Sequence, residues 1–199
     1  MVIENYEIKM DKELKIETWG RDDYKADDYH HPYEPTPYSV LERLVESEYI
    51  TKENVVIDYG CGKGRVGFYL SAKIGCETIG IDFDERMIEK SLKNRESFAG
   101  KKKPEFVCTS AEKYEIKKAD RFYFFNPFSI EILRSVLGKI IDSYYESPRS
   151  MTLFFYYPDE EYVAYLMTKN EFMFVDEIDC GDLYEGENDR ERILIFEIT

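Results

Sequence analysis

One stretch decides the fold of this chain, and it reads Val55-Val56-Ile57-Asp58-Tyr59-Gly60-Cys61-Gly62-Lys63-Gly64. Its first five residues form the short apolar run of a buried strand, and the next five form a glycine-rich turn. Glycine is needed where the backbone takes a positive φ, or where a ligand comes too close for a Cβ atom. A helix predicted over residues 65–73 follows the turn, so its free N–H groups would face a ligand bound there.

Strands and helices alternate along the rest of the chain. Short apolar runs predict strands over residues 55–59, 78–82, 105–109, 121–125, 151–156, 172–178 and 192–198. Helical spacing predicts the intervening helices, the first of them capped by Thr36 and started by Pro37. Such alternation favours a mostly parallel sheet covered on both faces. The last two strands have no helix between them, so we expect an α/β three-layer sandwich whose seven-stranded sheet includes an antiparallel C-terminal strand.

The composition is typical of one globular domain. The chain has 199 residues, of which 43% are hydrophobic and 16% aromatic, enough for a packed core. Its apolar runs fall short of the roughly 18 residues that a membrane span needs, and the N-terminal residues do not resemble a secretion signal. The four cysteines, at positions 61, 76, 108 and 180, form no CxxC pair or zinc spacing. We therefore expect free thiols, no metal site, no membrane partner and a cytoplasmic location.

The glycine turn can be compared with three ligand-binding patterns. A P-loop requires Gly-x-x-x-x-Gly-Lys-Ser/Thr, which the chain lacks, and a dinucleotide fingerprint requires a third glycine where Arg65 stands. The observed Gly-x-Gly-x-Gly follows Asp58, and about 18 residues beyond Gly64 the next strand ends in Gly80-Ile81-Asp82. This combination resembles the class I, Rossmann-like S-adenosylmethionine-dependent methyltransferases. The alternative is a glycine turn that only closes a tight loop.

The resemblance implies a cofactor site for S-adenosylmethionine at the carboxyl edge of the sheet. The glycines would let the backbone approach the methionine part, Asp58 would orient its amino group, and Asp82 would hold the ribose hydroxyls. Phe83 would pack beside the adenine. Many family members carry an acidic residue after the third strand, and here Ser110 stands at that position, so either Ser110 or Glu112 would meet the adenine amino group. The predicted cofactor-binding set is therefore Asp58, Gly60, Cys61, Gly62, Gly64, Asp82, Phe83, Ser110 and Glu112.

A second motif, Asn126-Pro127-Phe128, follows the fourth strand at the same edge. It resembles the Asn-Pro-Pro-Phe/Tyr signature of methyltransferases that act on amino groups, although the second proline is missing. An amide oxygen and a backbone carbonyl can accept hydrogen bonds from an amino group, and Phe128 can stack on a flat substrate. We predict these three residues as the catalytic set. The alternative places Phe128 in the core, at a strand end turned by Asn-Pro.

The resemblance implies one methyltransferase domain over residues 1–199, with residues 1–35 as an N-terminal cover segment and 36–199 as the core. His30 or His31 of the cover can act as a base near neutral pH. The aromatic runs over 122–125 and 154–157 are predicted as core strands, although Tyr156 and Tyr157 can reach the site.

Charge gives an expectation about the methyl acceptor. The formal net charge is -14, and both ends of the chain are acidic. We expect an acidic rim at the site, formed by the loop over 179–189 and by the N-terminal acids Asp22, Asp23, Asp27 and Asp28; the loop includes Asp182, Glu185 and Glu187. Such a rim repels phosphate backbones, so we expect a neutral or cationic acceptor, such as an amino nitrogen of a small molecule or protein. A nucleic-acid base methyltransferase and a non-catalytic cofactor-binding module remain alternatives, and the sequence does not predict the oligomeric state.

Overall fold

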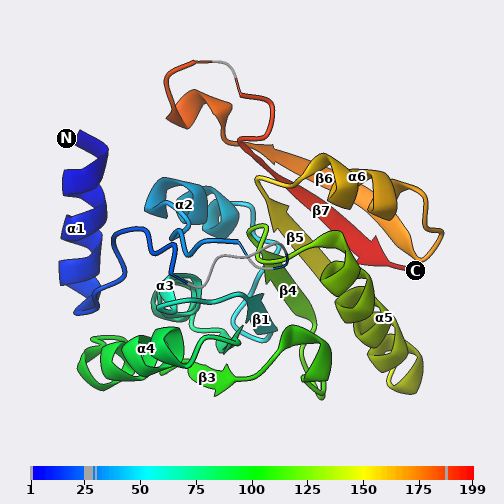
Figure 1. The fold of residues 1–199 in the computed structure, drawn as a ribbon, viewed down its shortest axis with the longest axis horizontal. Coiled ribbons are helices and arrows are strands. Elements are labelled where there is room, and N and C mark those ends of the chain that lie inside the picture. The colour runs from blue at the N-terminus through cyan, green and yellow to red at the C-terminus, as the bar shows by residue number, and fades with distance from the viewer. Residues whose placement is uncertain (1, 25–28, 30, 187) are drawn as a thin grey trace.

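The computed structural model describes residues 2–24, 29, 31–186 and 188–199. Within these residues, one sheet runs in the order β3-β2-β1-β4-β5-β7-β6 (Figure 1). Its strands are β1 (Val55–Tyr59), β2 (Glu77–Asp82), β3 (Glu105–Cys108), β4 (Arg121–Phe124), β5 (Thr152–Tyr156), β6 (Phe172–Asp179) and β7 (Arg192–Ile198). β1 to β5 pair in parallel, whereas β7 is antiparallel to both β5 and β6. The predicted fold class is confirmed, and each strand begins and ends within one residue of its predicted bounds.

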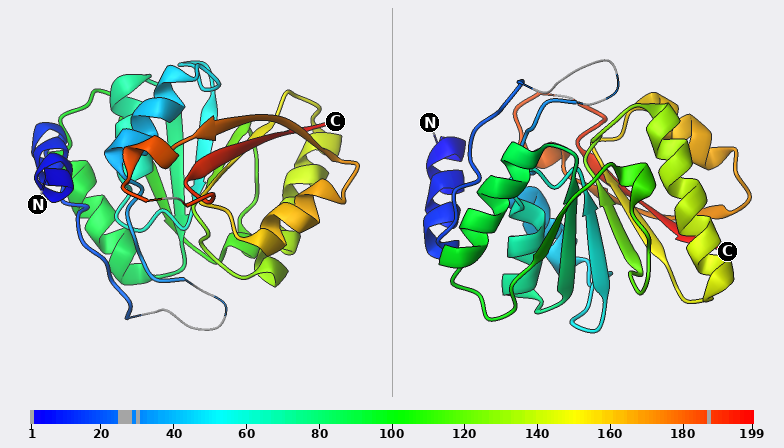
Figure 2. Two further views of the ribbon diagram at one scale, coloured as in Figure 1. Left: turned by 90° about the horizontal axis from the view of Figure 1, so that it is seen from above. Right: turned by 60° about the horizontal axis from the view of Figure 1, so that its bottom comes forward.

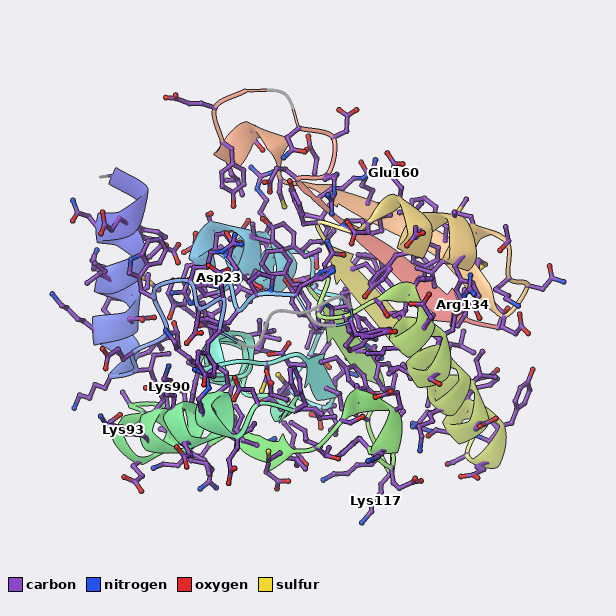
Figure 3. All side chains as sticks on the ribbon, in the orientation of Figure 1. Asp23, Lys90, Lys93, Lys117, Arg134 and Glu160 are labelled. Atoms are coloured by element: carbon purple, nitrogen blue, oxygen red, sulfur yellow. The ribbon has the colours of Figure 1, made fainter. Side chains whose placement is uncertain are left out.

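Helices cover both faces of the sheet (Figures 1 and 2). The longer helices are α1 (Val2–Leu14), α2 (Tyr38–Glu46), α3 (Arg65–Lys73), α4 (Glu85–Ser97), α5 (Ile130–Glu146) and α6 (Glu160–Met167), and the 3-10 turns are η1 (Ala111–Lys113) and η2 (Gly181–Leu183). Side chains of α1, α2 and α3 share one buried core with the sheet, and those of α5 and α6 share the other. α4 packs against β2 and β3. Charged residues such as Lys93, Lys117, Arg134 and Glu160 project outward into solvent (Figure 3).

The N-terminal segment differs from its prediction in two ways. Residues 2–14 form a regular helix, α1, which apolar spacing alone did not indicate. The first predicted helix has Pro37 rather than Thr36 as its N-cap, and no side chain caps it. The Thr36 hydroxyl instead lies 3.1 Å from the buried Tyr123 hydroxyl of β4. Thr36 therefore ties the segment before α2 to the centre of the sheet.

A buried arginine holds α1 on the sheet domain. Arg65, the first residue of α3, is 2% exposed and forms an ion pair with Glu7 and another, at 3.5 Å, with Asp11. Its Nε donates to the Thr18 hydroxyl at 2.7 Å, and its guanidinium stacks 4.3 Å from the Tyr38 ring centroid. A buried charge is tolerated only when it is paired, so Arg65 and the carboxylates of α1 hold each other in place. Arg65, which replaces the third glycine of the dinucleotide fingerprint, therefore anchors the N-terminal helix.

The topology brings the predicted site residues to one edge. β2 and β3 lie on one side of β1, and β4 and β5 lie on the other, so the strand order reverses between β1 and β4. Ligands of open α/β sheets bind outside the carboxyl ends of the strands at such a switch point. The four cysteines are free thiols, as predicted. Among the described residues, no helix is both long and apolar enough to cross a membrane.

Candidate active site

The glycine turn is closely packed by two other segments. Gly60 has φ +74°, and a Cβ atom there would lie 2.4 Å from Cβ of Pro127. Gly62 has φ +51°, and its Cβ would lie 2.1 Å from the ring of Tyr33. The Tyr33 hydroxyl donates to the Thr18 carbonyl at 2.6 Å, which holds the ring in place. Both glycines are therefore required by backbone conformation and by space, and the turn lies between the Asn-Pro-Phe tip and the N-terminal segment.

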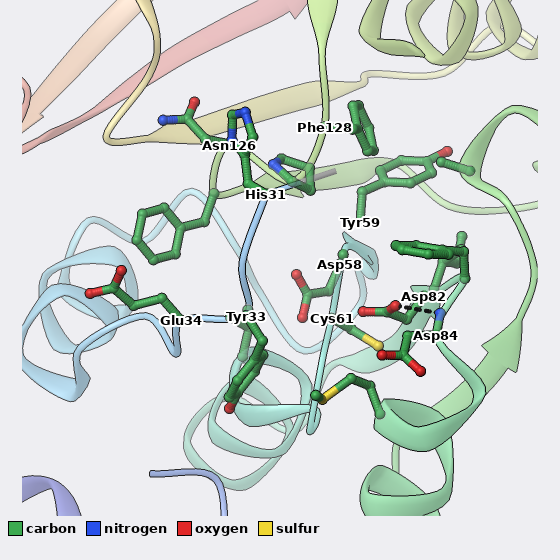
Figure 4. Close-up of a pocket in the computed structure, with 18 of the residues that line it drawn as sticks. His31, Tyr33, Glu34, Asp58, Tyr59, Cys61, Asp82, Asp84, Asn126 and Phe128 are labelled. Carbon is green, nitrogen blue, oxygen red and sulfur yellow. Dashed lines mark hydrogen bonds between the residues drawn. The ribbon is translucent and has the colours of Figure 1, made fainter. Parts of the chain in front are cut away.

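Two carboxylates lie beside the turn. The Asp82 carboxylate, at the end of β2, accepts hydrogen bonds from the Gly62 N–H at 2.8 Å and from the Asp84 N–H at 2.9 Å. Asp58, near the end of β1, is 5% exposed and lines the same cavity (Figure 4). Burial, with a contribution from the Asp82 charge, raises the pKa of Asp58 to about 8. Asp58 is therefore a carboxyl group in a site that favours its protonation until a cation is bound.

The cavity continues along the ends of β2 and β3. Phe83 lines it and is 38% exposed, which is unusual for a phenylalanine. Ser110 and Glu112 line it next to η1, and the Ser110 hydroxyl donates to the Glu112 carboxylate. Cys61 is buried in its wall, and burial raises the pKa of this thiol well above its usual range. Seven of the nine predicted cofactor-binding residues therefore line the cavity, whereas Gly62 and Gly64 lie in the adjoining turn, covered by the rings of Tyr33 and Phe106.

The Asn-Pro-Phe tip closes the opposite wall. Asn126 has φ +38°, and its side chain turns toward the loop after β5, where it donates to the Tyr157 carbonyl and accepts from the Asp159 N–H at 3.1 Å. Pro127 packs on Gly60. Phe128 is only 4% exposed and packs edge-on against Phe124 at 6.4 Å, so it belongs to the core as well as to the cavity wall.

The N-terminal segment folds over the cavity. Asp22 and Tyr33 pair through two backbone hydrogen bonds, of 3.0 and 2.9 Å. The His31 N–H donates to the Pro127 carbonyl at 3.3 Å, and the Ser129 N–H donates to the Tyr29 carbonyl at 2.9 Å. The segment is therefore attached directly to the Asn-Pro-Phe tip. His31 lines the cavity, whereas His30, Asp27 and Asp28 lie outside the described residues.

A second cavity adjoins the first and was not predicted. The two cavities share five lining residues, which are His31, Pro32, Glu34, Phe125 and Asn126. The second cavity, of about 430 Å³, is also lined by Tyr156, Tyr157, Tyr184 and Glu191. Tyr156 and Tyr157 were already indicated by their place at the end of the fifth strand. Nothing in the local sequence around Tyr184 and Glu191 distinguishes them from other residues of an acidic loop.

Only part of the predicted acidic rim reaches these cavities. Asp22 lines the first cavity but forms ion pairs with Arg86 and Lys90 of α4. Asp182 forms an ion pair with Arg43 on α2. Glu185 is exposed, and Glu187 lies outside the described residues.

Comparison with known proteins identifies the family. A family model described as a methyltransferase domain matches residues 50–149, which is half of the chain. The chain belongs to this methyltransferase family. The family cofactor is S-adenosylmethionine, and the cavity fits it, since Asp58 lines the cavity as an acceptor for an amino group and Phe83 offers a partly exposed ring.

Individual relatives differ in their acceptors. A protein-lysine N-methyltransferase of Saccharolobus islandicus is 31% identical over 68 residues, which are 34% of this chain and 42% of the relative. This chain therefore matches less than half of that protein's length. Magnesium protoporphyrin IX methyltransferase of Synechocystis, solved with S-adenosylmethionine bound, has a TM-score of 0.60 and 19% identity over 81% of this chain and 77% of its own.

A TehB-like S-adenosylmethionine-dependent methyltransferase of Corynebacterium glutamicum matches the whole length of the chain. It covers 100% of this chain and 98% of its own, with a TM-score of 0.58 and 17% identity. At this identity, the likeness establishes the fold.

Proposed function

We propose that this protein transfers a methyl group from S-adenosylmethionine to an amino nitrogen, and that the acceptor is a lysine side chain of a protein. The observation that carries the proposal is the junction of the two cavities at Asn126. The first cavity has the features of a cofactor site, and the second opens beside the tip that follows β4. In this proposal residues 36–199 form the catalytic core and residues 1–35 cover it.

The cofactor would lie across the switch point of the sheet. Asp58 would accept hydrogen bonds from the amino group of its methionine part, which would lie beside Gly60 and Cys61. Each oxygen of the Asp82 carboxylate can accept two hydrogen bonds, so this group can hold ribose hydroxyls while it still binds the turn. Phe83 would contact the adenine face, and the Ser110–Glu112 pair would meet the adenine edge.

Positioning would supply most of the rate. When bound, the cofactor presents an electrophilic methyl group on a sulfonium. A lysine ammonium has no free lone pair, so the acceptor would first give one proton to a base. The neutral nitrogen would then form the N–C bond with its lone pair, while the pair of the methyl–sulfur bond would stay on sulfur. Asn126 and the backbone of Pro127 would hold that nitrogen in line with the bond between the methyl group and sulfur. Holding the reacting atoms in this alignment lowers the activation free energy. His31 lines both cavities and can take the proton.

Charge supports an amine rather than a nucleic acid. The chain carries 41 acidic and 27 basic residues. The lysines at 101–103 and 117–118 precede β3 and β4, so they lie at the amino edge of the sheet, opposite the cavities. A polyanion would gain little attraction near the site. The lysine methyltransferase of Saccharolobus islandicus supports the same acceptor class.

Calorimetry with two variants tests the proposal. We expect the wild-type protein to bind S-adenosylmethionine and S-adenosylhomocysteine but not NADH. Asp82→Ala should weaken this binding strongly, whereas Asn126→Ala should spare it and lower turnover. Equal cofactor affinity in the wild type and in Asp82→Ala would refute the cofactor site.

Acceptor classes can be separated with labelled cofactor and mass spectrometry of the products. Lysine-containing proteins should be methylated in preference to RNA and DNA. Preferential methylation of RNA or DNA would support the nucleic-acid alternative instead. Cofactor binding without transfer to any acceptor would support a non-catalytic module.

A further inference from the structure

We propose that the second cavity recognises the ammonium group of the acceptor lysine, and that Glu191 with the surrounding tyrosine rings determines this specificity. The inference rests on the proposed function, because it concerns the acceptor of that same reaction. It assigns a role to a cavity and to residues that the cofactor site does not use.

Aromatic rings make up much of the cavity wall. Phe125 packs against Tyr156 with ring centroids 4.7 Å apart and against Tyr157 at 6.4 Å. The hydroxyls of Tyr156 and Tyr184 are 3.3 Å apart. The faces of such rings attract cations, and aromatic cages are a common means of binding substituted ammonium groups. Phe125 also lines the first cavity, so an ammonium group held among these rings would lie beside the cofactor site.

The ring of Tyr157 already holds a cation within the protein. The Arg190 guanidinium lies 4.3 Å from the Tyr157 ring centroid and pairs with the Asp159 carboxylate. This contact shows that the wall of the cavity accommodates a positive charge on an aromatic face when a carboxylate is near.

The other charges of the cavity leave Glu191 available for a ligand. Asp159 is paired with Arg190, and Glu34 lies 3.5 Å from Arg21, which also pairs with Asp23. Glu191 has no ion pair among the described residues, and its carboxylate accepts a hydrogen bond from the Tyr156 hydroxyl at 2.8 Å. The two arginines and three carboxylates that line the cavity leave one net negative charge, which matches one ammonium group.

Burial agrees with this assignment. Burial raises the pKa of Glu191 and outweighs the Tyr156 hydrogen bond, which lowers it; the Glu34 charge raises it and the Arg190 charge lowers it. A cation bound in the cavity would favour the ionised form of the Glu191 carboxylate. The same cavity would disfavour an acceptor that carries a phosphate or carboxylate, because it would place that anion near Glu191 and Glu34.

A binding experiment tests the proposal without requiring turnover. The protein, saturated with S-adenosylhomocysteine, is titrated by calorimetry with a mixture of short peptides that have lysine at the central position and blocked ends. The matched probe is the same mixture with Nε-acetyl-lysine, which lacks the charge. We expect the lysine peptides to bind and the acetylated peptides to bind much more weakly.

Two glutamate variants locate the effect. Glu191→Gln keeps the shape of the side chain and should weaken lysine-peptide binding at least about tenfold, since hydrogen bonds to charged groups contribute that much. Glu185→Gln removes the same charge from an exposed position on the same loop, outside both cavities, and should leave binding unchanged. Tyr184→Leu removes one ring from the cavity and should also weaken lysine-peptide binding. S-adenosylhomocysteine affinity should remain at the wild-type value in all three variants, which also verifies that they are folded.

The outcomes separate this inference from the proposed function. If S-adenosylhomocysteine does not bind the wild type, the cofactor site is wrong and the proposed function fails. If it binds but the lysine and acetyl-lysine peptides bind equally, or Glu191→Gln and Glu185→Gln behave alike, the second cavity does not recognise an ammonium group while the methyltransferase assignment stands.

Discussion

Cofactor affinity should depend on pH through Asp58. This carboxyl group is 5% exposed, and burial with the nearby Asp82 charge raises its pKa to about 8. The amino group of the cofactor is a cation at neutral pH, so it favours the ionised carboxylate. Binding below pH 8 therefore requires Asp58 to release a proton, and affinity should fall as the pH falls.

The size of the effect follows from the pKa. With a pKa of about 8, Asp58 is about half ionised at pH 8 and about one per cent ionised at pH 6. The Kd of S-adenosylhomocysteine should therefore rise about 50-fold from pH 8 to pH 6, and nearly one proton should be released per ligand at pH 7. Asp58→Asn cannot ionise, so its affinity should be weak and nearly independent of pH.

Calorimetric titrations between pH 6 and pH 9, in two buffers with different heats of ionisation, measure both quantities. A constant Kd between pH 6 and pH 8 in the wild type would refute the argument, as would the same pH dependence in Asp58→Asn.

The pH dependence of protein stability gives an independent check on the pKa of Asp58. A carboxyl group whose folded pKa is raised above 3.8 stabilises the protein at low pH and loses that contribution as the pH rises through about 8. Asp58→Asn should therefore raise the melting temperature of the ligand-free protein more at pH 9 than at pH 5.

Two further substitutions test the anchor and the turn. Arg65→Ala would leave two carboxylates of α1 buried without their cation. This variant should lower the free energy of unfolding, measured by chemical denaturation, by about 3–5 kcal/mol. The control Lys9→Ala, on the exposed face of the same helix, should change the free energy of unfolding by less than about 0.5 kcal/mol. A similar loss in both variants would contradict the anchoring role. Gly62→Ala should reduce both S-adenosylhomocysteine affinity and stability, because its Cβ would lie 2.1 Å from the Tyr33 ring. The control Gly75→Ala, at φ +80° with open space around it, should cost only about 1–2 kcal/mol of backbone strain and leave affinity unchanged. Wild-type affinity in Gly62→Ala would show that the turn tolerates a side chain.

Local sequence predicted the elements that depend on neighbouring residues. The period of apolar residues indicated all seven strands of the sheet, and the places of the glycine turn and of Asp82 after two strands predicted that they lie near each other at one sheet edge. These predictions succeed because parallel strands joined by right-handed crossovers must bring their carboxyl ends to one edge. Residues that follow such strands therefore converge, even though the chain separates them widely.

The hydrogen-bond partners of the Asn126 side chain were not predictable from the local sequence. Its place after β4 predicted a position at the site, which the structure has, but its side chain is bonded to the loop over 157–159. Those partners become neighbours only when β5 pairs beside β4. The role proposed for Asn126 in orienting the acceptor is therefore supported by its place at the junction of the cavities, while its amide also fixes the neighbouring wall.

The sequence by itself determined the succession of strands and helices, the sheet edge at which the predicted site residues meet, and the family resemblance, because each depends on a short motif or on a repeating spacing. Only the tertiary structure decided that α1 docks through Arg65 and that His31, Tyr156 and Glu191 line one cavity. The physical reason is that these contacts join segments far apart in the chain. The contact of Glu191 with Tyr156 arises because β7 pairs antiparallel with β5, and the contacts of α1 arise because Glu7 and Asp11 meet Arg65 across the chain.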